Sequence, residues 1–306
     1  MIGVLSLSRT VRAAAEGRRA GRSRAVWWLA ALGSIGYLML LIWVHYYQER
    51  LIFDREPLPA THRFALADVQ EESIPVPGAN LSALHLRLPN PRGMIFFLHG
   101  NGGNLATWLT STEFYRNANY DLVMIDYRGY GKSSGRIESE EQLRADVRAA
   151  WQAVAPAYIG KPRVIYGRSL GTALAAGLAA EVQPELTILV SPYCSMAQLM
   201  RQHYPLLPPA LLRYPLPTCA DARRIDGRVL LVHGEEDRLI PIAHSEKLAE
   251  IVPHARLLRL AGAAHADVHR FAAYTSELLS ALQALPAPEK RGPPTDIQRT
   301  DRGATH

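Results

Sequence analysis

The segment VIYGRSLGTA, residues 164–173, decides the fold that this sequence predicts. β-Branched residues end a predicted strand, Gly-Arg-Ser-Leu-Gly follows, and an Ala- and Leu-rich helix is expected to continue through Ala180. A G-x-S-x-G motif between a strand and a helix is typical of a nucleophile elbow, a sharp turn that exposes the serine hydroxyl. Gly167 and Gly171 lack side chains, so the flanking backbones can close in around the turn. The motif therefore predicts that Ser169 is a nucleophile, although the bare pentapeptide also arises by chance in a chain with 22 Gly.

Six short apolar runs alternate with helix-like stretches along the chain. They lie at residues 94–98, 122–125, 164–166, 187–190, 229–232 and 256–260. This alternation predicts an α/β fold with a mostly parallel central sheet and helices on both faces. The clearest helix is expected at about 138–154, where Ser139 and Gln142 form a capping signal. Two earlier strands are expected within residues 73–88, with a turn at residues 77–80.

A glycine-rich loop, HGNGGN at residues 99–104, directly follows the run at 94–98. When a serine attacks a carbonyl group, the oxyanion that forms must be met by preplaced N–H donors. Glycines allow a backbone N–H to turn into the site, and the residue after the nucleophile supplies a second donor. We therefore expect the backbone N–H groups of Asn101 and Leu170 to form an oxyanion hole. A plain turn rich in Gly and Asn is the alternative interpretation.

A serine nucleophile also needs a base and an acid that orients it, and in this fold the acid precedes the histidine along the chain. Asp237 comes shortly after the run at 229–232, and His265 lies in the loop after the run at 256–260. Both runs end at the edge where parallel sheets carry their sites, so Asp237 and His265 complete the predicted triad. The open alternatives are Glu235 and Glu236 for the acid and His99, His233, His254 and His269 for the base.

Residues 26–44, VWWLAALGSIGYLMLLIWV, contain no charged side chain. At 1.5 Å per residue this segment extends about 28 Å, close to the thickness of the hydrocarbon core of a bilayer. Trp27 and Trp28 at one end and Trp43, Tyr46 and Tyr47 at the other resemble interfacial aromatic belts. The sequence HYYQER that follows offers no small-residue cleavage site, so we predict a retained transmembrane anchor. A buried helix of a soluble protein is the alternative.

The net charge of +6 is confined to the ends of the chain. Residues 1–25 carry six Arg and one Glu, residues 285–306 carry four basic and three acidic groups, and residues 26–284 carry 24 of each sign. The body therefore has no excess of positive charge that would indicate a nucleic-acid partner. Because positive flanks stay on the cytoplasmic side of a membrane, residues 1–25 are expected to form a basic cytoplasmic N-terminus. The catalytic body would then lie outside the cytoplasm, in the periplasm of a Gram-negative cell.

Four motifs make the chain resemble the α/β-hydrolase superfamily from about Leu81 to Leu282. They are HGNGGN at 99–104, DYRGYGKSSG at 126–135, GRSLG at 167–171 and GEEDRLIP at 234–241. With the single N-terminal span, the combination is similar to the membrane-anchored serine hydrolases of the ABHD12, ABHD13 and BEM46-type branch, which includes lysophospholipases and protein depalmitoylases. The resemblance implies hydrolysis of an ester, thioester or amide bond of a small-molecule or lipid-like acyl substrate through an acyl-enzyme. A serine peptidase on the same fold and a catalytically silent anchored binding module are the alternatives.

The resemblance also suggests how the rest of the chain is organised. Residues 45–80 are expected to form a juxtamembrane lead-in with the first strand, and residues 81–284 the catalytic domain. Residues 194–227, rich in Leu and Pro, correspond to the insertion that forms a small cap in many α/β-hydrolases, although a simple packing segment is an equal alternative.

Three smaller expectations remain. Cys194 and Cys219, the only cysteines, bracket the expected cap and could pair outside the cytoplasm, but two cysteines leave the pairing open. Residues 285–306 lack apolar content and are expected to be a disordered tail. The sequence contains no H-E-x-x-H motif and no paired cysteine ligand set, so no metal and no cofactor are expected.

Overall fold

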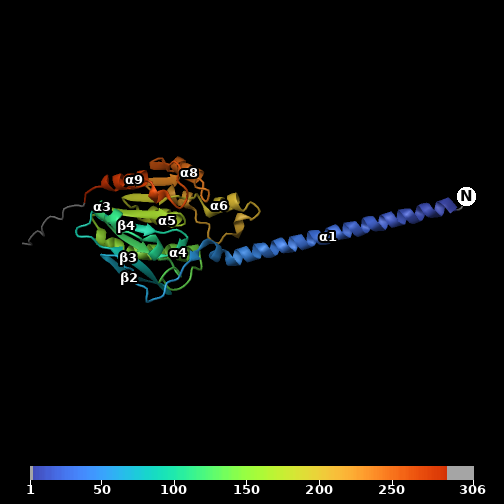
Figure 1. Cartoon of the computed structure of the whole chain (residues 1–306), viewed down its shortest axis with the longest axis horizontal. Helices are drawn as coiled ribbons and strands as arrows, with labels where there is room; N and C mark the ends of the chain where they lie inside the picture. Colours follow the sequence, from blue (N-terminus) through green and yellow to red (C-terminus); the bar gives the residue numbers. More distant parts are fainter. Residues whose placement is uncertain (1–2, 288–306) are drawn as a thin grey trace, which may run out of the picture.

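The computed structural model describes the backbone of residues 3–287 and the side chains of residues 26–287. One helix, α1 (Gly3–Ile52), projects from a rounded body that contains the other elements (Figure 1). Its segment Val26–Ile52 reaches a mean hydropathy of 1.8, and 0% of that window is buried against the body. By length and composition α1 can therefore cross a membrane. The side chains of the arginine-rich residues 1–25, and most of the predicted tail from residue 288 onward, lie outside the described part.

The body is built on one eight-stranded sheet. From one edge to the other, the strands are β2 (Val69–Val76), β3 (Ala79–Leu86), β6 (Tyr120–Ile125), β4 (Gly93–Leu98), β7 (Arg163–Arg168), β8 (Leu186–Val190), β9 (Arg228–Gly234) and β10 (Ala255–Leu260). β2 and β3 form an antiparallel hairpin and β3 is antiparallel to β6, whereas the five remaining pairings are parallel. The predicted mostly parallel sheet is confirmed, and each of the six apolar runs lies within one of its strands.

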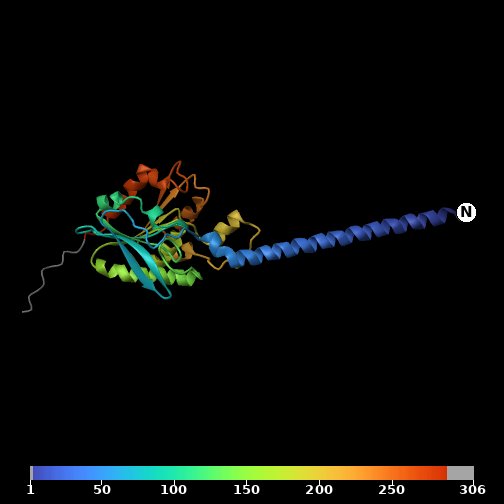
Figure 2. The ribbon, with the colours of Figure 1, turned by 60° about the horizontal axis from the view of Figure 1, so that its bottom comes forward.

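Helices cover both faces of the sheet, and each face has its own hydrophobic core (Figure 2). One face carries α4 (Glu140–Val154), α5 (Gly171–Val182), α7 (Thr218–Ala222) and α8 (Ala243–Ile251); the other carries α3 (Glu113–Ala118) and α9 (Ala272–Gln283). The short helices α2 (Leu105–Trp108), η1 (Ala155–Tyr158) and η3 (Val268–Arg270) lie between them. Because successive strand residues point to opposite faces, Phe96 packs on Trp151 of α4 whereas Phe97 stacks on Tyr166. The predicted cap of α4 is present, since the Ser139 hydroxyl accepts a hydrogen bond from the Gln142 N–H at 3.0 Å.

The chain that leaves α1 is tied directly to the glycine-rich loop at 99–104. β1 (Asp54–Arg55) pairs in parallel with β5 (Gly102–Gly103) to form a second, two-stranded sheet. Phe53, just before β1, is buried, and its ring lies edge-on to that of Tyr214 with centroids 5.1 Å apart. The expected lead-in is therefore integrated into the structure: its first residues extend α1, and the next residues hold the loop.

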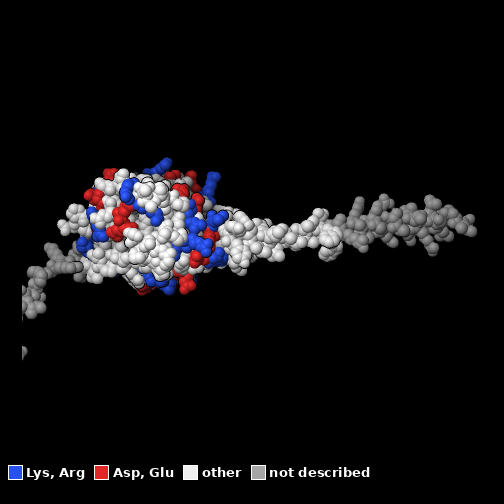
Figure 3. All heavy atoms as spheres, turned by 90° about the horizontal axis from the view of Figure 1, so that it is seen from below, with Lys and Arg blue, Asp and Glu red and all other residues white. Residues whose placement is uncertain are grey.

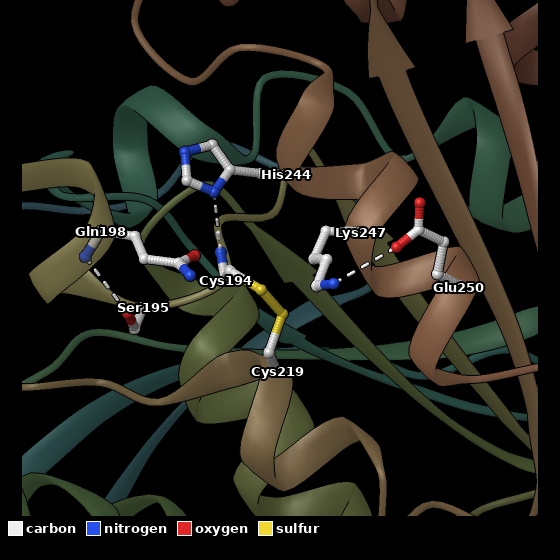
Figure 4. Close-up of a disulfide and its surroundings, with 7 residues drawn as sticks. All are labelled: Cys194, Ser195, Gln198, Cys219, His244, Lys247 and Glu250. Atoms are coloured by element: carbon white, nitrogen blue, oxygen red, sulfur yellow. Dashed lines mark hydrogen bonds and ion pairs between the residues drawn. A yellow bond between two sulfur atoms is a disulfide. The ribbon is translucent and has the colours of Figure 1, made fainter. Parts of the chain in front are cut away.

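The expected cap at about 194–227 divides into two parts in the structure. α6 (Met196–His203) and the loop that contains η2 (Pro209–Leu211) lie beside the base of α1 (Figure 1), whereas α7 packs on α5 within the body. Cys194 and Cys219 form a disulfide with their Cα atoms 4.7 Å apart (Figure 4). The backbone N–H of Cys194 also donates to Nδ1 of His244 at 3.2 Å, which ties this junction to α8.

Candidate active site

The G-R-S-L-G motif forms the sharp turn that the sequence predicts. β7 ends at Arg168 and α5 begins at Gly171, so Ser169 lies on the turn between them with φ +51°, a left-handed conformation that non-glycine residues rarely adopt. A side chain at Gly171 would collide with the carbonyl oxygens of Leu98 and His99, and a Cβ at Gly167 would lie 2.6 Å from the Ala175 Cβ. Both glycines are therefore required by close backbone packing around the serine.

The structure brings Ser169, His265 and Asp237 together from three separate loops. His265 Nε2 lies 3.0 Å from Ser169 Oγ, and His265 Nδ1 lies 2.7 Å from Asp237 Oδ2. The Asp237 side chain is fully buried, whereas the His265 ring is 21% exposed, so the histidine is the member of the chain that faces solvent. These two hydrogen bonds form one continuous path from the serine hydroxyl to the carboxylate.

The alternative acids and bases lie elsewhere. Glu235 and Glu236 are both exposed, and Glu235 forms an ion pair with Arg259 at 2.9 Å. His254 and His269 are also exposed, and neither forms a hydrogen bond to the serine. Among the alternatives weighed from the sequence, only the buried His99 and His233 lie close to the candidate site.

Asp237 is held as a carboxylate by several donors. Its Oδ1 accepts hydrogen bonds from the N–H groups of Leu239 at 3.0 Å and Ile240 at 2.8 Å. Burial of the carboxyl group opposes ionisation, but the hydrogen bonds from His233, His265 and Ile240 outweigh it and keep the pKa of Asp237 well below its usual range. An ionised Asp237 can orient the His265 ring and stabilise the positive charge that the ring gains when it takes a proton.

His233 supports Asp237 from behind, a role that the sequence did not reveal. Its Nδ1 lies 2.6 Å from Ser245 Oγ, and its Nε2 lies 2.6 Å from the Ile240 carbonyl oxygen and 3.3 Å from Asp237 Oδ2. The ring is fully buried. The spacing of four residues between His233 and Asp237 was visible in the sequence, but a histidine at a strand end gave no indication of its partners.

The predicted oxyanion donors lie next to the serine. A Cβ at Gly100 would lie 3.5 Å from the Ser169 Cβ, so the glycine-rich loop covers the elbow closely. The Gly100 carbonyl oxygen accepts a hydrogen bond from Nδ1 of the buried His99 at 2.7 Å. Because the C=O and N–H of a trans peptide point in opposite directions, this bond turns the N–H of Asn101 away from the His99 ring. Within residues 26–287, the N–H groups of Asn101 and Leu170 donate to no protein acceptor.

Arg168, the variable residue of the motif, fixes the loop that carries His265. Its guanidinium donates to the His265 carbonyl oxygen and, at 3.4 Å, to that of Val190, while the residue is only 7% exposed. This contact holds the backbone of His265 without using its ring. The sequence gave no signal for it, because the contact joins residues 97 positions apart.

A metal site is not evident in the part of the chain that the structure describes. Between residues 26 and 287, no three or more His, Cys, Asp or Glu side chains lie together in an arrangement that could hold a metal ion. The site chemistry described above uses a hydroxyl, an imidazole, a carboxylate and backbone N–H groups.

Comparisons with known proteins find the same architecture. A family model described as serine aminopeptidase, S33 (Hydrolase_4), matches residues 89–219, a range that includes Asn101 and Ser169 but ends before Asp237 and His265. Alpha/beta hydrolase domain-containing protein 17B of Xenopus tropicalis is 32% identical over 209 residues, which cover 66% of this chain and 70% of that protein. Protein 17C of Mus musculus is 32% identical over 197 residues, which cover 62% of this chain and 59% of that protein.

Solved structures extend the comparison to the fold. An esterase from Pyrococcus furiosus has a TM-score of 0.61 at 18% identity, covering 76% of this chain and 97% of its own. Est1E from Butyrivibrio proteoclasticus, solved with ferulic acid, has a TM-score of 0.57 at 17% identity, covering 69% of this chain and 96% of its own.

These comparisons correct the finer resemblance that the motifs suggested. The relatives reported above are 17B and 17C proteins, not members of the ABHD12, ABHD13 or BEM46-type branch. The motifs that suggested that branch surround the serine and its N–H donors, and such residues are constrained by the chemistry more than by the branch.

Proposed function

Because this chain belongs to the α/β-hydrolase superfamily and is a serine hydrolase, we propose that Ser169, His265 and Asp237 are its catalytic triad and that it cleaves an ester or thioester of an acyl-type substrate. The observation that carries this proposal is the pair of hydrogen bonds, 3.0 and 2.7 Å long, that connects the Ser169 hydroxyl through His265 to Asp237.

The proposed reaction follows from this path. Ser169 Oγ attacks the acyl carbonyl carbon while His265 Nε2 takes its proton, and the N–H groups of Asn101 and Leu170 receive the oxyanion. His265 then gives the proton to the departing alkoxide or thiolate, which leaves an acyl-enzyme. Water enters, loses a proton to His265 and attacks the same carbon, so the acid is released and Ser169 regains its proton.

The proposed setting is a membrane surface. The apolar part of α1, residues 26–44, would serve as a single-pass anchor, and the six arginines before it favour a cytoplasmic N-terminus with the body outside the cytoplasm. An anchored enzyme meets substrates that partition into lipid at high local concentration, which supports an acyl or lipid-like substrate over a freely dissolved one.

A peptide substrate is the second candidate. It is favoured by the description of the matching family model, serine aminopeptidase. The same serine, histidine and oxyanion donors would cleave an amide, with an amine as the leaving group.

The test uses the full-length protein with a fluorophosphonate probe, which reacts with activated serines. Wild type should be labelled, Ser169→Ala should not, and Ser276→Ala, an exposed serine on α9, should be labelled like wild type. Matched panels of acyl esters, acyl thioesters and aminoacyl amides then separate the two substrate classes. Labelling of Ser169→Ala at the level of wild type would overturn the assignment, and turnover of the amides alone would favour the peptidase.

A further inference from the structure

A loop of the cap runs alongside the apolar part of α1 (Figures 1 and 2). We call residues 204–212 the cap loop. The Tyr37 hydroxyl donates to the Leu206 carbonyl oxygen at 2.6 Å, and Gln48 Nε2 donates to the Leu211 carbonyl oxygen at 3.1 Å. The Arg213 N–H donates in turn to Gln48 Oε1 at 2.7 Å. The cap loop is therefore fastened to α1 at two levels.

The upper of these levels lies inside the proposed membrane span. Tyr37 precedes Val44, the end of the apolar segment, by seven residues, which corresponds to about 10 Å along a helix. The hydrocarbon core of a bilayer is about 30 Å thick, which matches residues 26–44. A loop that is bonded to Tyr37 would therefore reach well into the half of the bilayer nearest the body.

The side chains of the cap loop suit such a position. Its sequence, YPLLPPALL, contains no charged residue. Leu206 is 80% exposed and Tyr204 is 61% exposed, although both are large and apolar or amphipathic. Exposed apolar side chains next to a membrane-spanning helix are typical of segments that enter the interface.

The backbone of the cap loop is also suited to an apolar environment, where unpaired N–H groups are costly. Three of its nine residues are prolines, which have no N–H. Four of the other six N–H groups donate to carbonyl oxygens nearby, namely those of Tyr204, Leu207, Leu211 and Leu212. An ordinary exposed loop has no need of this internal pairing, because water satisfies its backbone.

Charged side chains border the cap loop on the body. Arg201 and Arg213 flank it in the sequence, and Figure 3 shows Lys and Arg side chains gathered on the body next to the base of α1. Basic groups at this level can reach lipid headgroups while the apolar loop lies deeper.

We propose that the cap loop inserts into the bilayer beside α1, so that the catalytic body contacts lipid through two elements and receives its acyl substrate from the lipid phase. This inference rests on the proposed membrane anchor and deepens the proposed function. A path from the loop to the site is present: His203, at the end of α6, bonds the Leu239 carbonyl oxygen at 2.8 Å. Leu239 is 51% exposed and lies two residues from Asp237, so apolar surface continues from the cap loop to the triad.

The experiment measures the depth of the loop in the full-length protein. Because both natural cysteines are paired in the disulfide, Leu206→Cys introduces one free thiol for an environment-sensitive fluorophore. Ile159→Cys is the matched control: Ile159 is 68% exposed but precedes β7 at the opposite edge of the sheet. Both proteins are reconstituted into phosphatidylcholine and phosphatidylglycerol vesicles with or without lipids brominated on the acyl chains.

Brominated lipids should quench the fluorophore at residue 206 about twofold or more and leave that at residue 159 unchanged, because only the first lies at acyl-chain depth. Equal, negligible quenching at both positions would overturn the insertion. Fluorophosphonate labelling of the same samples keeps the two ideas separate. Labelled serine without quenching would remove only the inserted cap loop, whereas absence of labelling in the unmodified wild type would remove the hydrolase assignment itself.

Discussion

The body contains a second chain of hydroxyl, histidine and carboxylate that matches the proposed triad in its distances but not in its surroundings. His85 Nε2 lies 2.8 Å from the Tyr158 hydroxyl, and His85 Nδ1 lies 2.9 Å from Glu72 Oε1. The corresponding distances around His265 are 3.0 and 2.7 Å. Interatomic distances alone would therefore assign two active sites.

The surroundings separate the two chains. The Tyr158 hydroxyl also donates to Asp121 at 2.6 Å, and burial together with this hydrogen bond raises the pKa of Tyr158 far above its usual value. The His85 side chain is 2% exposed, against 21% for His265. Tyr158 lies on the 3₁₀ helix η1 and not on a strained turn beside unpaired N–H groups. The comparison teaches that a nucleophile needs access and preplaced oxyanion donors in addition to a histidine and an acid.

Replacing the two histidines should give the largest contrast. His265→Ala should lower kcat for a short-chain ester by about 10⁶, since loss of the base in a well-studied serine hydrolase costs that much. His85→Ala should leave kcat per folded molecule within about twofold, because the ring touches no reacting atom. The measurement is steady-state kinetics normalised to folded protein. A large loss of kcat in folded His85→Ala would show that the two chains are not functionally distinct.

Replacing the acid tests the choice among three neighbouring carboxylates. Asp237→Asn should lower kcat by about 10⁴, because an amide favours the wrong tautomer of the histidine. Glu236→Gln, on an exposed side chain beside it, should change kcat by less than about twofold. If Glu236→Gln proved the damaging change and Asp237→Asn the mild one, Asp237 would lose its proposed role although Ser169 and His265 would keep theirs.

Removing the hydroxyl of the second chain should affect stability and not catalysis. Tyr158→Phe leaves His85 and Asp121 each without a buried partner, which should lower the free energy of unfolding by about 1–3 kcal/mol. Tyr46→Phe, on a 69% exposed side chain, is the matched control and should have no effect. Thermal unfolding of the detergent-solubilised proteins provides the measurement. Equal melting temperatures for the two variants would mean that the buried network contributes no stability.

The smallest expected difference is in the pH dependence of stability. Burial, with the neighbouring Arg87, lowers the pKa of His85 from its ordinary 6.5. As the pH falls below 6.5, the unfolded chain therefore binds this proton before the folded chain does, and the folded state loses stability. For Asp237 the pKa is depressed from 3.8, so its stabilisation is complete above that value and declines only at lower pH.

These two windows can be separated with variants. Between pH 7.5 and 5, the melting temperature of His85→Gln should decline less than that of wild type, whereas Asp237→Asn should follow wild type. The difference isolates His85, because the other histidines are unchanged. Parallel curves for wild type and His85→Gln over this range would contradict the assignment.

Local patterns were sufficient to predict the core of this molecule. The elbow, the six parallel strands, the Ser139 cap and the positions of Asp237 and His265 follow from short motifs and from the rule that parallel strands carry sites at their carboxyl edge. Each of these features depends on residues that are close in sequence or on a fixed order of elements.

Features that depend on distant contacts could not be predicted. The contact of His233 with Asp237, the bond from Arg168 to the loop of His265 and the pairing of β1 with β5 leave no periodic signal. The second chain around His85 was also invisible, because its members lie on elements separated by up to 73 positions. Tertiary packing, and not local propensity, determines such contacts.

The pairing of β1 with β5 determines where the body could be released from its anchor. The Asp54 N–H donates to the Asn101 carbonyl oxygen at 3.1 Å, so the first residues after α1 hold the loop that would receive the oxyanion. A protease that cuts before Phe53 would release a body with this clamp intact. Cleavage a few residues later, beyond Arg55, would free the body but leave the loop without its neighbouring strand. Shedding and inactivation are thus separated by a few peptide bonds, and a soluble form of this enzyme has to begin before β1.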